Sequence, residues 1–272
     1  MGYDALSEAE WQQVDRVRDL LDDGKVDQAR REAQPLIGSR PDQPDVRILD
    51  ATIALDERDA ERALRALQGA ETSADPAWFF HLRALASYEL THFEAARDDA
   101  ERAIAVRPDF PEAHDLLSRA FDHLGQPDKA MEHAEDAETL DPETFPMPLD
   151  VSDAEFDTMV EKSLAELPAK VRQHIEELPV LVEPLPPKSV LASERPVLSP
   201  DILGLFVGRH LLERSLADVP GAPGAIYLFR RNLLRASPDR ESLAREVRIT
   251  VQHEIGHMLG LDEDDLEAWG LA

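Results

Sequence analysis

The sequence predicts a protein of two parts, an all-α helical repeat solenoid followed by a small α+β domain. Small residues and prolines recur about every 34 residues through the first half, whereas the second half combines short apolar runs with one long amphipathic helix. At 272 residues the chain is long enough for both parts. A proline-rich stretch over 140–153 separates the two patterns, so we expect domains at residues 1–146 and 147–272.

The repeat is visible as identical residues at matching positions. Four residues recur 34 positions later, as the pairs Ala96 and Ala130, Ala100 and Ala134, Ala103 and Ala137, and Pro108 and Pro142. A period of this length fits two antiparallel helices with their turns, and alanine recurs where the two helices touch because it lets the backbones approach closely. Four periods fill roughly residues 8–144, and the second of them is degenerate.

Turn and breaker residues follow the same period. Gly24 and Gly125 are expected at the turns between paired helices. The prolines expected at the ends of the second helices are Pro41, Pro76, Pro108 and Pro142. With its period, alanine pattern and terminal prolines, this half resembles the tetratricopeptide repeat, although Phe80 and His114 stand where that family has an early tryptophan.

The resemblance implies a curved solenoid whose concave face binds a peptide or a protein partner. The formal net charge of −27 would steer a basic peptide toward it and argues against nucleic acid as the main partner. Most histidines of the repeats are interpreted as solvent-exposed helix residues without a role; these are His81, His92, His114, His123 and His133.

The second half begins with a helix signal. Ser152 is a good N-cap, and a helical apolar stripe follows it as far as Pro168. Strands are then predicted in 178–184, in 202–215 with a turn at Gly208, and in 224–234. A long helix over 239–259 completes the α+β domain.

The long helix carries the candidate chemistry in the stretch "VQHEIGHMLGLDED". Its predicted buried stripe consists of Val247, Val251, Ile255, Met258 and Leu259. On roughly the opposite side lie His253 and His257, four residues apart, which is the spacing that lets two imidazoles on one helix bind Zn²⁺. Glu254 would take a proton from the zinc-bound water that attacks an amide carbonyl.

A third protein ligand is needed to complete a catalytic zinc site. Gly260 can end the helix and let the chain turn back beneath the metal. Glu263 lies three residues beyond it and is the preferred third ligand. Asp262 is the alternative, although it could instead be the N-cap of a last helix.

The second half resembles the small bacterial metallopeptidase domains called minimal zincins. The stretches that carry the resemblance include "DAEFDTMVEKSLAELP", "GAIYLFRRNLL" and "EVRITVQHEIGHMLGLDEDDLEAWG". The resemblance implies that His253 and His257 bind zinc, that Glu254 is catalytic and that an acidic residue after the glycine is the third ligand. That family commonly has aspartate where this chain has Glu263.

Composition agrees with these assignments and narrows the site chemistry. The chain has no cysteine, so a transition-metal site must use His, Asp or Glu. We see no secretory signal near the first residues and no apolar run long enough to span a membrane, so we expect a cytoplasmic protein that does not bind membranes.

Three functions remain open from the sequence. The first is a zinc metallopeptidase whose repeats recruit a protein or peptide. The second is a non-catalytic adaptor that keeps the zincin-like domain as a scaffold. The third is a zinc hydrolase acting on bonds other than peptide bonds. The intact Glu254 favours catalysis. Strand 224–230 is a candidate edge for docking a peptide, and Tyr227 and Arg231 are interpreted as sheet packing and surface charge rather than as oxyanion ligands.

Overall fold

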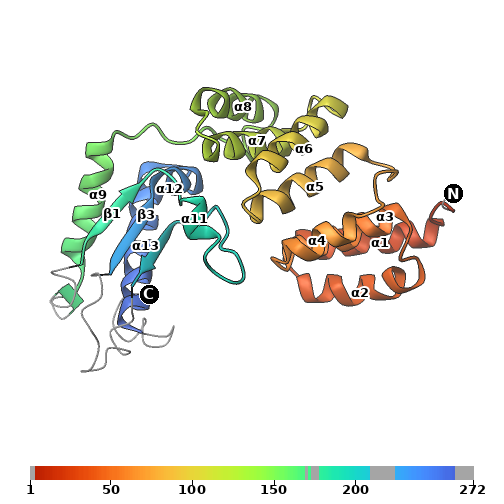
Figure 1. Cartoon of the computed structure of the whole chain (residues 1–272), viewed down its shortest axis with the longest axis horizontal. Coiled ribbons are helices and arrows are strands. Elements are labelled where there is room, and N and C mark those ends of the chain that lie inside the picture. The colour runs from red at the N-terminus through yellow and green to blue at the C-terminus, as the bar shows by residue number, and fades with distance from the viewer. Residues whose placement is uncertain (1–3, 169–170, 173–177, 209–223, 261–272) are drawn as a thin grey trace. The chain divides into compact units, whose positions relative to one another are not determined.

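The computed structural model describes residues 4–168, 171–172, 178–208 and 224–260. The chain folds into two compact units, residues 1–146 with 192–199 and residues 147–191 with 200–272. In its described part the first unit is built from helices, whereas the second combines a small sheet with helices (Figure 1). The predicted fold class, an all-α repeat array followed by a small α+β domain, is therefore confirmed.

The first unit consists of helices paired along the chain, α1 with α2, α3 with α4, α5 with α6 and α7 with α8 (Figure 1). Their bounds are α1 Glu8–Asp22, α2 Val26–Ser39, α3 Pro44–Asp56, α4 Ala60–Leu67, α5 Pro76–Glu89, α6 Phe93–Val106, α7 Pro111–His123 and α8 Pro127–Leu140. The short α4 is the second helix of the repeat that is degenerate in sequence.

The repeating alanines lie where the paired helices meet. Ala96, Ala100 and Ala103 on α6 are each 0% exposed, as the periodic pattern predicts. Gly24 and Gly125 form the tight turns within two of the hairpins, at φ of 71° and 68°. Both values lie in the left-handed region that glycine adopts without a steric penalty.

One proline of the period has a different role from the predicted one. Pro76 does not end a second helix, because it is the first residue of α5, and the Asp75 side chain caps that helix by accepting from the Trp78 N–H. Proline is favoured at this position because the first N–H of a helix has no partner within the helix. Pro41 and Pro108 do follow the ends of α2 and α6.

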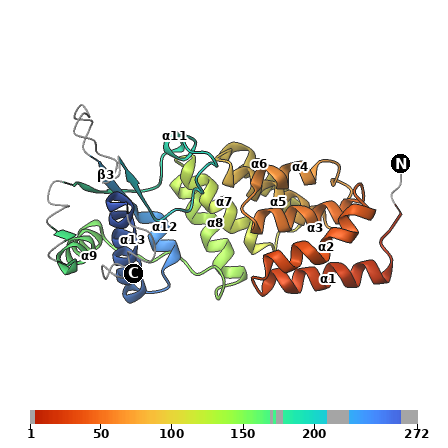
Figure 2. The same ribbon diagram turned by 90° about the horizontal axis from the view of Figure 1, so that it is seen from below.

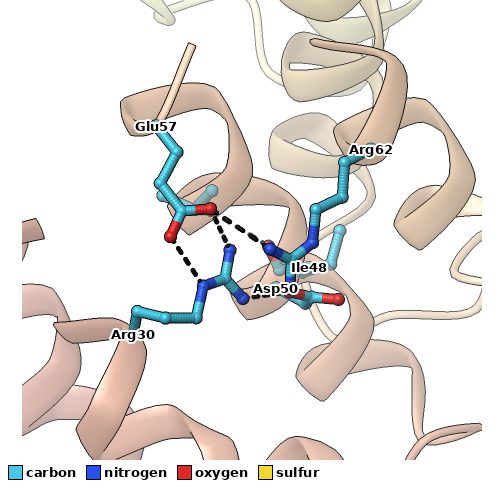
Figure 3. Close-up of polar contacts among 6 residues, drawn as sticks. Arg30, Ile48, Asp50, Glu57 and Arg62 are labelled. Atoms are coloured by element: carbon cyan, nitrogen blue, oxygen red, sulfur yellow. Dashed lines mark hydrogen bonds and ion pairs between the residues drawn. The ribbon is translucent and has the colours of Figure 1, made fainter. Parts of the chain in front are cut away.

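Successive hairpins are joined by an ion network (Figure 3). Arg30 on α2 donates from Nε and Nη2 to the two carboxylate oxygens of Glu57, at 2.8 and 2.7 Å, and from Nη1 to Asp50 of α3 at 2.5 Å. Arg62 on α4 binds the same two acids, at 3.1 Å from Asp50 and 3.3 Å from Glu57. Two guanidinium groups from neighbouring repeats, Arg30 of the first and Arg62 of the second, therefore share two carboxylates of the second repeat.

The interpretation of the repeat histidines as mostly exposed is wrong, because His92 alone of the five is exposed, His123 and His133 are half-buried, and His81 and His114 are buried. His81 is 6% exposed and stacks on Trp78 at 5.1 Å, and His114 is 8% exposed. Both lie on first helices of hairpins, which are covered by their own second helix and by the neighbouring repeat. Such helices bury more than one face, so a polar residue on them does not have to face water.

The second unit has helices around a three-stranded sheet. Its elements are α9 Asp153–Glu166, β1 Val180–Glu183, α11 Lys188–Leu191, β2 Gly204–Val207, β3 Ala225–Phe229, α12 Arg230–Ala236 and α13 Arg240–Leu259. The strand order is β1-β3-β2, with β1 parallel and β2 antiparallel to β3. Helix α13 contacts α9, β2 and β3, and Figure 2 shows it between α9 and the sheet.

The core of this unit lies between α13, α9 and the sheet. Phe156 of α9, Ile226 and Leu228 of β3, and the α13 residues Val247 and Val251 belong to one buried cluster. Because side chains alternate along a strand, Ile226 and Leu228 face α13 whereas Tyr227 between them faces the other side of the sheet. Tyr227 is therefore not directed toward the helix that carries the motif.

The predicted strand over 224–234 is too long. The strand ends at Phe229 and the chain continues directly into α12, where Leu233 and Leu234 are buried. Arginine and leucine are good helix formers, and the Arg231 N–H donates to the Pro184 carbonyl beyond β1. The strand predicted in 178–184 is confirmed as β1 and the first part of 202–215 as β2. The second part of 202–215 falls largely outside the described residues.

No helix in the described part of the chain is long and apolar enough to cross a membrane.

Candidate functional site

Helix α13 is fixed at both ends and along one face. Asp239 caps its first turn by accepting from the Ser242 N–H at 2.7 Å, and Gly260 ends it at a φ of 70°. The predicted apolar stripe is buried, with Val247, Val251 and Ile255 each 0% exposed. A helix held in this way presents its remaining face in a defined direction.

The two histidines of the motif converge on that remaining face. Nε2 of His253 lies 2.9 Å from Nε2 of His257, and the two rings are nearly perpendicular, with centroids 4.4 Å apart. Both side chains are exposed. Two nitrogens that point at one another from successive turns are arranged as two ligands of a single cation.

Glu254 lies between the histidines in sequence but on the side of the helix that faces the sheet. It is 7% exposed, and its Oε2 accepts a hydrogen bond of 2.6 Å from the backbone N–H of Phe206 on β2. Burial raises the pKa of Glu254 above its usual value, and the Phe206 N–H and the nearby His253 oppose this shift. The carboxylate is thus held near His253 and is a better proton acceptor than an exposed glutamate.

The sequence did not indicate the role of Gly204 in this arrangement. A Cβ at Gly204 would lie 2.5 Å from Cγ2 of Thr250 and 3.2 Å from Cγ of Glu254. Glycine is therefore needed for β2 to lie this close to α13. A glycine inside a strand signals such an approach, but the sequence alone does not tell which element approaches it.

The remaining predicted residues are placed as follows. Glu263 and Asp262, the two candidates for the third ligand, lie outside the described residues.

Arg231 is in the first turn of α12, where burial and the neighbouring Arg235 lower its pKa. Strand β3 cannot be a docking edge, because β1 and β2 flank it on both sides. Among the described strands, the edge next to α13 is β2.

Each half of the chain matches the model of a known protein family. Residues 175–271 match the model of the zincin-like metallopeptidases, and residues 14–77 and 81–143 match a tetratricopeptide repeat model. The chain thus contains tetratricopeptide repeats followed by a zincin-like domain. The zincin-like match contains the whole of α13, and so the histidine pair and Glu254.

No curated protein matches this repeat–zincin chain. Among solved structures, two crystal structures of MamA are 18% identical to it, with TM-scores of 0.40 and 0.41, over 59% and 63% of this chain and 88% of each MamA chain. A crystal structure of PilW, described as a widely conserved type IV pilus biogenesis factor, is 13% identical, with a TM-score of 0.33, over 63% of this chain and 92% of that one.

Proposed function

We propose that the zincin-like domain is a zinc-dependent peptidase and that the repeats recruit its substrate or a partner protein. The observation that carries the proposal is the convergence of His253 Nε2 and His257 Nε2 at 2.9 Å, beside a buried glutamate. The donors fit zinc, because neutral imidazole and carboxylate are its usual ligands in a chain without cysteine.

Each residue of the motif has a separate role in this proposal. His253 and His257 hold the metal, and Glu263 or alternatively Asp262 supplies the third ligand. When bound, zinc would acidify a water molecule and polarise the peptide carbonyl. Glu254 would take the proton from the attacking water and pass it to the leaving amine.

Strand β2 offers a path for an extended substrate. Its Phe206 N–H donates to Glu254, so the backbone of β2 runs directly beside the proposed base. A peptide added along an edge strand is held by main-chain hydrogen bonds and needs no particular sequence. Side-chain preferences would then arise from the surrounding pockets, and the repeats would select the protein to be cut.

The proposal is tested with the full chain and a Glu254→Gln variant. Zinc content is measured by inductively coupled plasma mass spectrometry, and cleavage is measured on a peptide library. The expected result is zinc in both proteins and cleavage by the wild type alone. Zinc in both without cleavage of peptides or proteins would favour the adaptor, and absence of zinc from the wild type would refute the site.

The third ligand is settled by comparing Glu263→Ala with Asp262→Ala. We expect Glu263→Ala to lose zinc and Asp262→Ala to keep it. Loss of zinc from Asp262→Ala alone would assign the position to Asp262. Both changes remove one carboxylate from adjacent positions, so each serves as the control for the other.

A further inference from the structure

Three potential metal ligands meet in the fourth hairpin of the repeat unit, within the structurally described residues. His114 is on α7, and His133 and Asp136 are on α8. The His114 Nδ1 lies 3.1 Å from the His133 Nδ1 and 3.3 Å from Oδ2 of Asp136, and the His133 Nδ1 is 3.7 Å from the same oxygen. We call these three side chains the repeat cluster.

The hydrogen bond of the Nε2 atom determines the tautomer of His114. Its Nε2 lies 3.1 Å from the carbonyl oxygen of Pro108, which can only accept, so Nε2 carries the hydrogen. In the neutral ring, Nδ1 then presents a lone pair to the other two members of the cluster. A ring N–H bonded to a backbone carbonyl is the usual support for a histidine that binds a metal through its other nitrogen.

The ring of His133 is held in a fixed orientation by aromatic stacking. Its ring stacks on Phe121, with centroids 5.5 Å apart and planes 3° from parallel. Its Nδ1 lies 3.1 Å from the His114 Nδ1 and 3.7 Å from the Asp136 carboxylate, so it faces the other two members of the cluster.

The spacing of the three atoms fits tetrahedral coordination. With metal–ligand distances of about 2.0–2.1 Å, the ligands of a tetrahedral Zn²⁺ are about 3.3 Å apart. The three observed distances of 3.1, 3.3 and 3.7 Å lie around this value. The Asp136 side chain is 52% exposed, so solvent reaches the position of a fourth ligand.

The preceding repeat shows why these positions come together. The residues 34 positions before the cluster are Phe80, Asp99 and Arg102. They also meet, since Arg102 is 3.0 Å from Asp99 and its guanidinium lies 5.9 Å from the ring of Phe80. The hairpin therefore brings the same three positions together in both repeats. The third repeat fills them with an aromatic ring and an ion pair, and the fourth fills them with three metal-binding side chains.

We propose that the repeat cluster is a second zinc site, in which His114 Nδ1, His133 Nδ1 and Asp136 Oδ2 bind the ion and water occupies the fourth position. The ion joins α7 to α8 and stabilises the last hairpin of the repeat array. This site is separate from the motif on α13 and does not depend on the proposed peptidase activity.

The test removes the α13 motif first, so that only the second site is measured. A full-length His253→Ala, His257→Ala double variant is stripped of metal and titrated with ZnCl₂, and with CoCl₂ as an optical probe. Asp136→Asn is then added, because this exposed side chain can lose its charge without disturbing the core. Glu135→Gln, at another exposed acid on α8, is the matched control.

The double variant is expected to bind about one equivalent of zinc. Cobalt should give the intense visible absorption of a tetrahedral centre, and zinc should raise the melting temperature. Adding Asp136→Asn should weaken zinc binding at least about tenfold and abolish the thermal shift, whereas Glu135→Gln should change neither. A double variant that binds no zinc would overturn the proposal. Equal zinc binding by the Asp136→Asn and Glu135→Gln variants would overturn it too.

Discussion

The backbone N–H of Phe206 donates a 2.6 Å hydrogen bond to Oε2 of Glu254, joining β2 to the helix that carries the histidine pair. The two residues are 48 positions apart in sequence. Their contact fixes the carboxylate of Glu254 relative to β2, which is an edge strand among the described strands and the proposed path of an extended peptide. The proposed base and the proposed substrate path are thus held together by one hydrogen bond.

Replacing Glu254 with glutamine should reduce kcat/KM for peptide cleavage by about 10²–10⁴-fold, because the amide cannot take a proton from the attacking water. Zinc content should remain at the wild-type value, since the two histidines are untouched. Glu246→Gln, the same change two turns earlier on α13, should leave both quantities unchanged. Equal activity of the two variants would remove Glu254 from the mechanism.

Replacing Gly204 with alanine should destabilise the zincin-like domain by about 1–3 kcal/mol, the usual cost of an extra group in a tightly packed contact. The added Cβ would lie 2.5 Å from Thr250 Cγ2 and 3.1 Å from the Tyr227 carbonyl oxygen, so the Thr250 side chain or β2 itself has to move. Urea denaturation measures the loss, and we also expect lower peptidase activity. Gly38→Ala is the control, because nothing lies within 4 Å of its added Cβ and it is in a helix, where alanine is favoured by up to about 1 kcal/mol.

The parts of this protein that the sequence predicted well depend on local signals. The spacing of Ala96, Ala100 and Ala103 indicates one face of a helix that packs against the other helix of its hairpin. The spacing of His253 and His257 places two side chains on one face of a helix. Each pattern lies within a single helix, where geometry follows directly from residue number.

The features that the sequence did not predict depend on contacts between elements. The approach of Gly204 to α13 and the bond from Phe206 to Glu254 join residues about fifty positions apart. The burial of His81 depends on how Trp78 and Phe110 pack around it. The residues after Phe229 are good helix formers and favour α12. The apolar run before them is typical of a strand, however, and nothing in the sequence shows where that strand ends.

Replacing His81 with phenylalanine should make the repeat unit more resistant to acid. Burial, reinforced by Arg119 and Arg107, lowers the pKa of His81 to about 3. Above about pH 6.5 the histidine is neutral in both states; below it the unfolded chain takes up a proton that the folded chain cannot, so stability falls by up to about 1.4 kcal/mol per pH unit. Between pH 7.5 and pH 5 the wild type should therefore lose about 2 kcal/mol more than His81→Phe.

The His81 prediction is checked by urea denaturation at both pH values. Phenylalanine keeps an aromatic ring between Trp78 and Phe110, so the comparison at pH 7.5 measures any change in packing by itself. His92→Phe is the control for removing a histidine that is not buried, because His92 is exposed at the start of α6. Parallel stability curves for the wild type and His81→Phe would contradict the prediction.

Replacing Arg30 with lysine should destabilise the repeat array by about 1–3 kcal/mol, although the charge is kept. Arg30 is 15% exposed and binds both oxygens of Glu57 while also reaching Asp50, and one ammonium group cannot reproduce this two-pronged geometry. Thermal and urea denaturation measure the loss. Arg16→Lys is the control, because Arg16 is 56% exposed and makes a single contact of 3.1 Å with Glu32, so its change should stay within about 0.5 kcal/mol. If the two variants are equally stable, the network in Figure 3 does not hold the hairpins together.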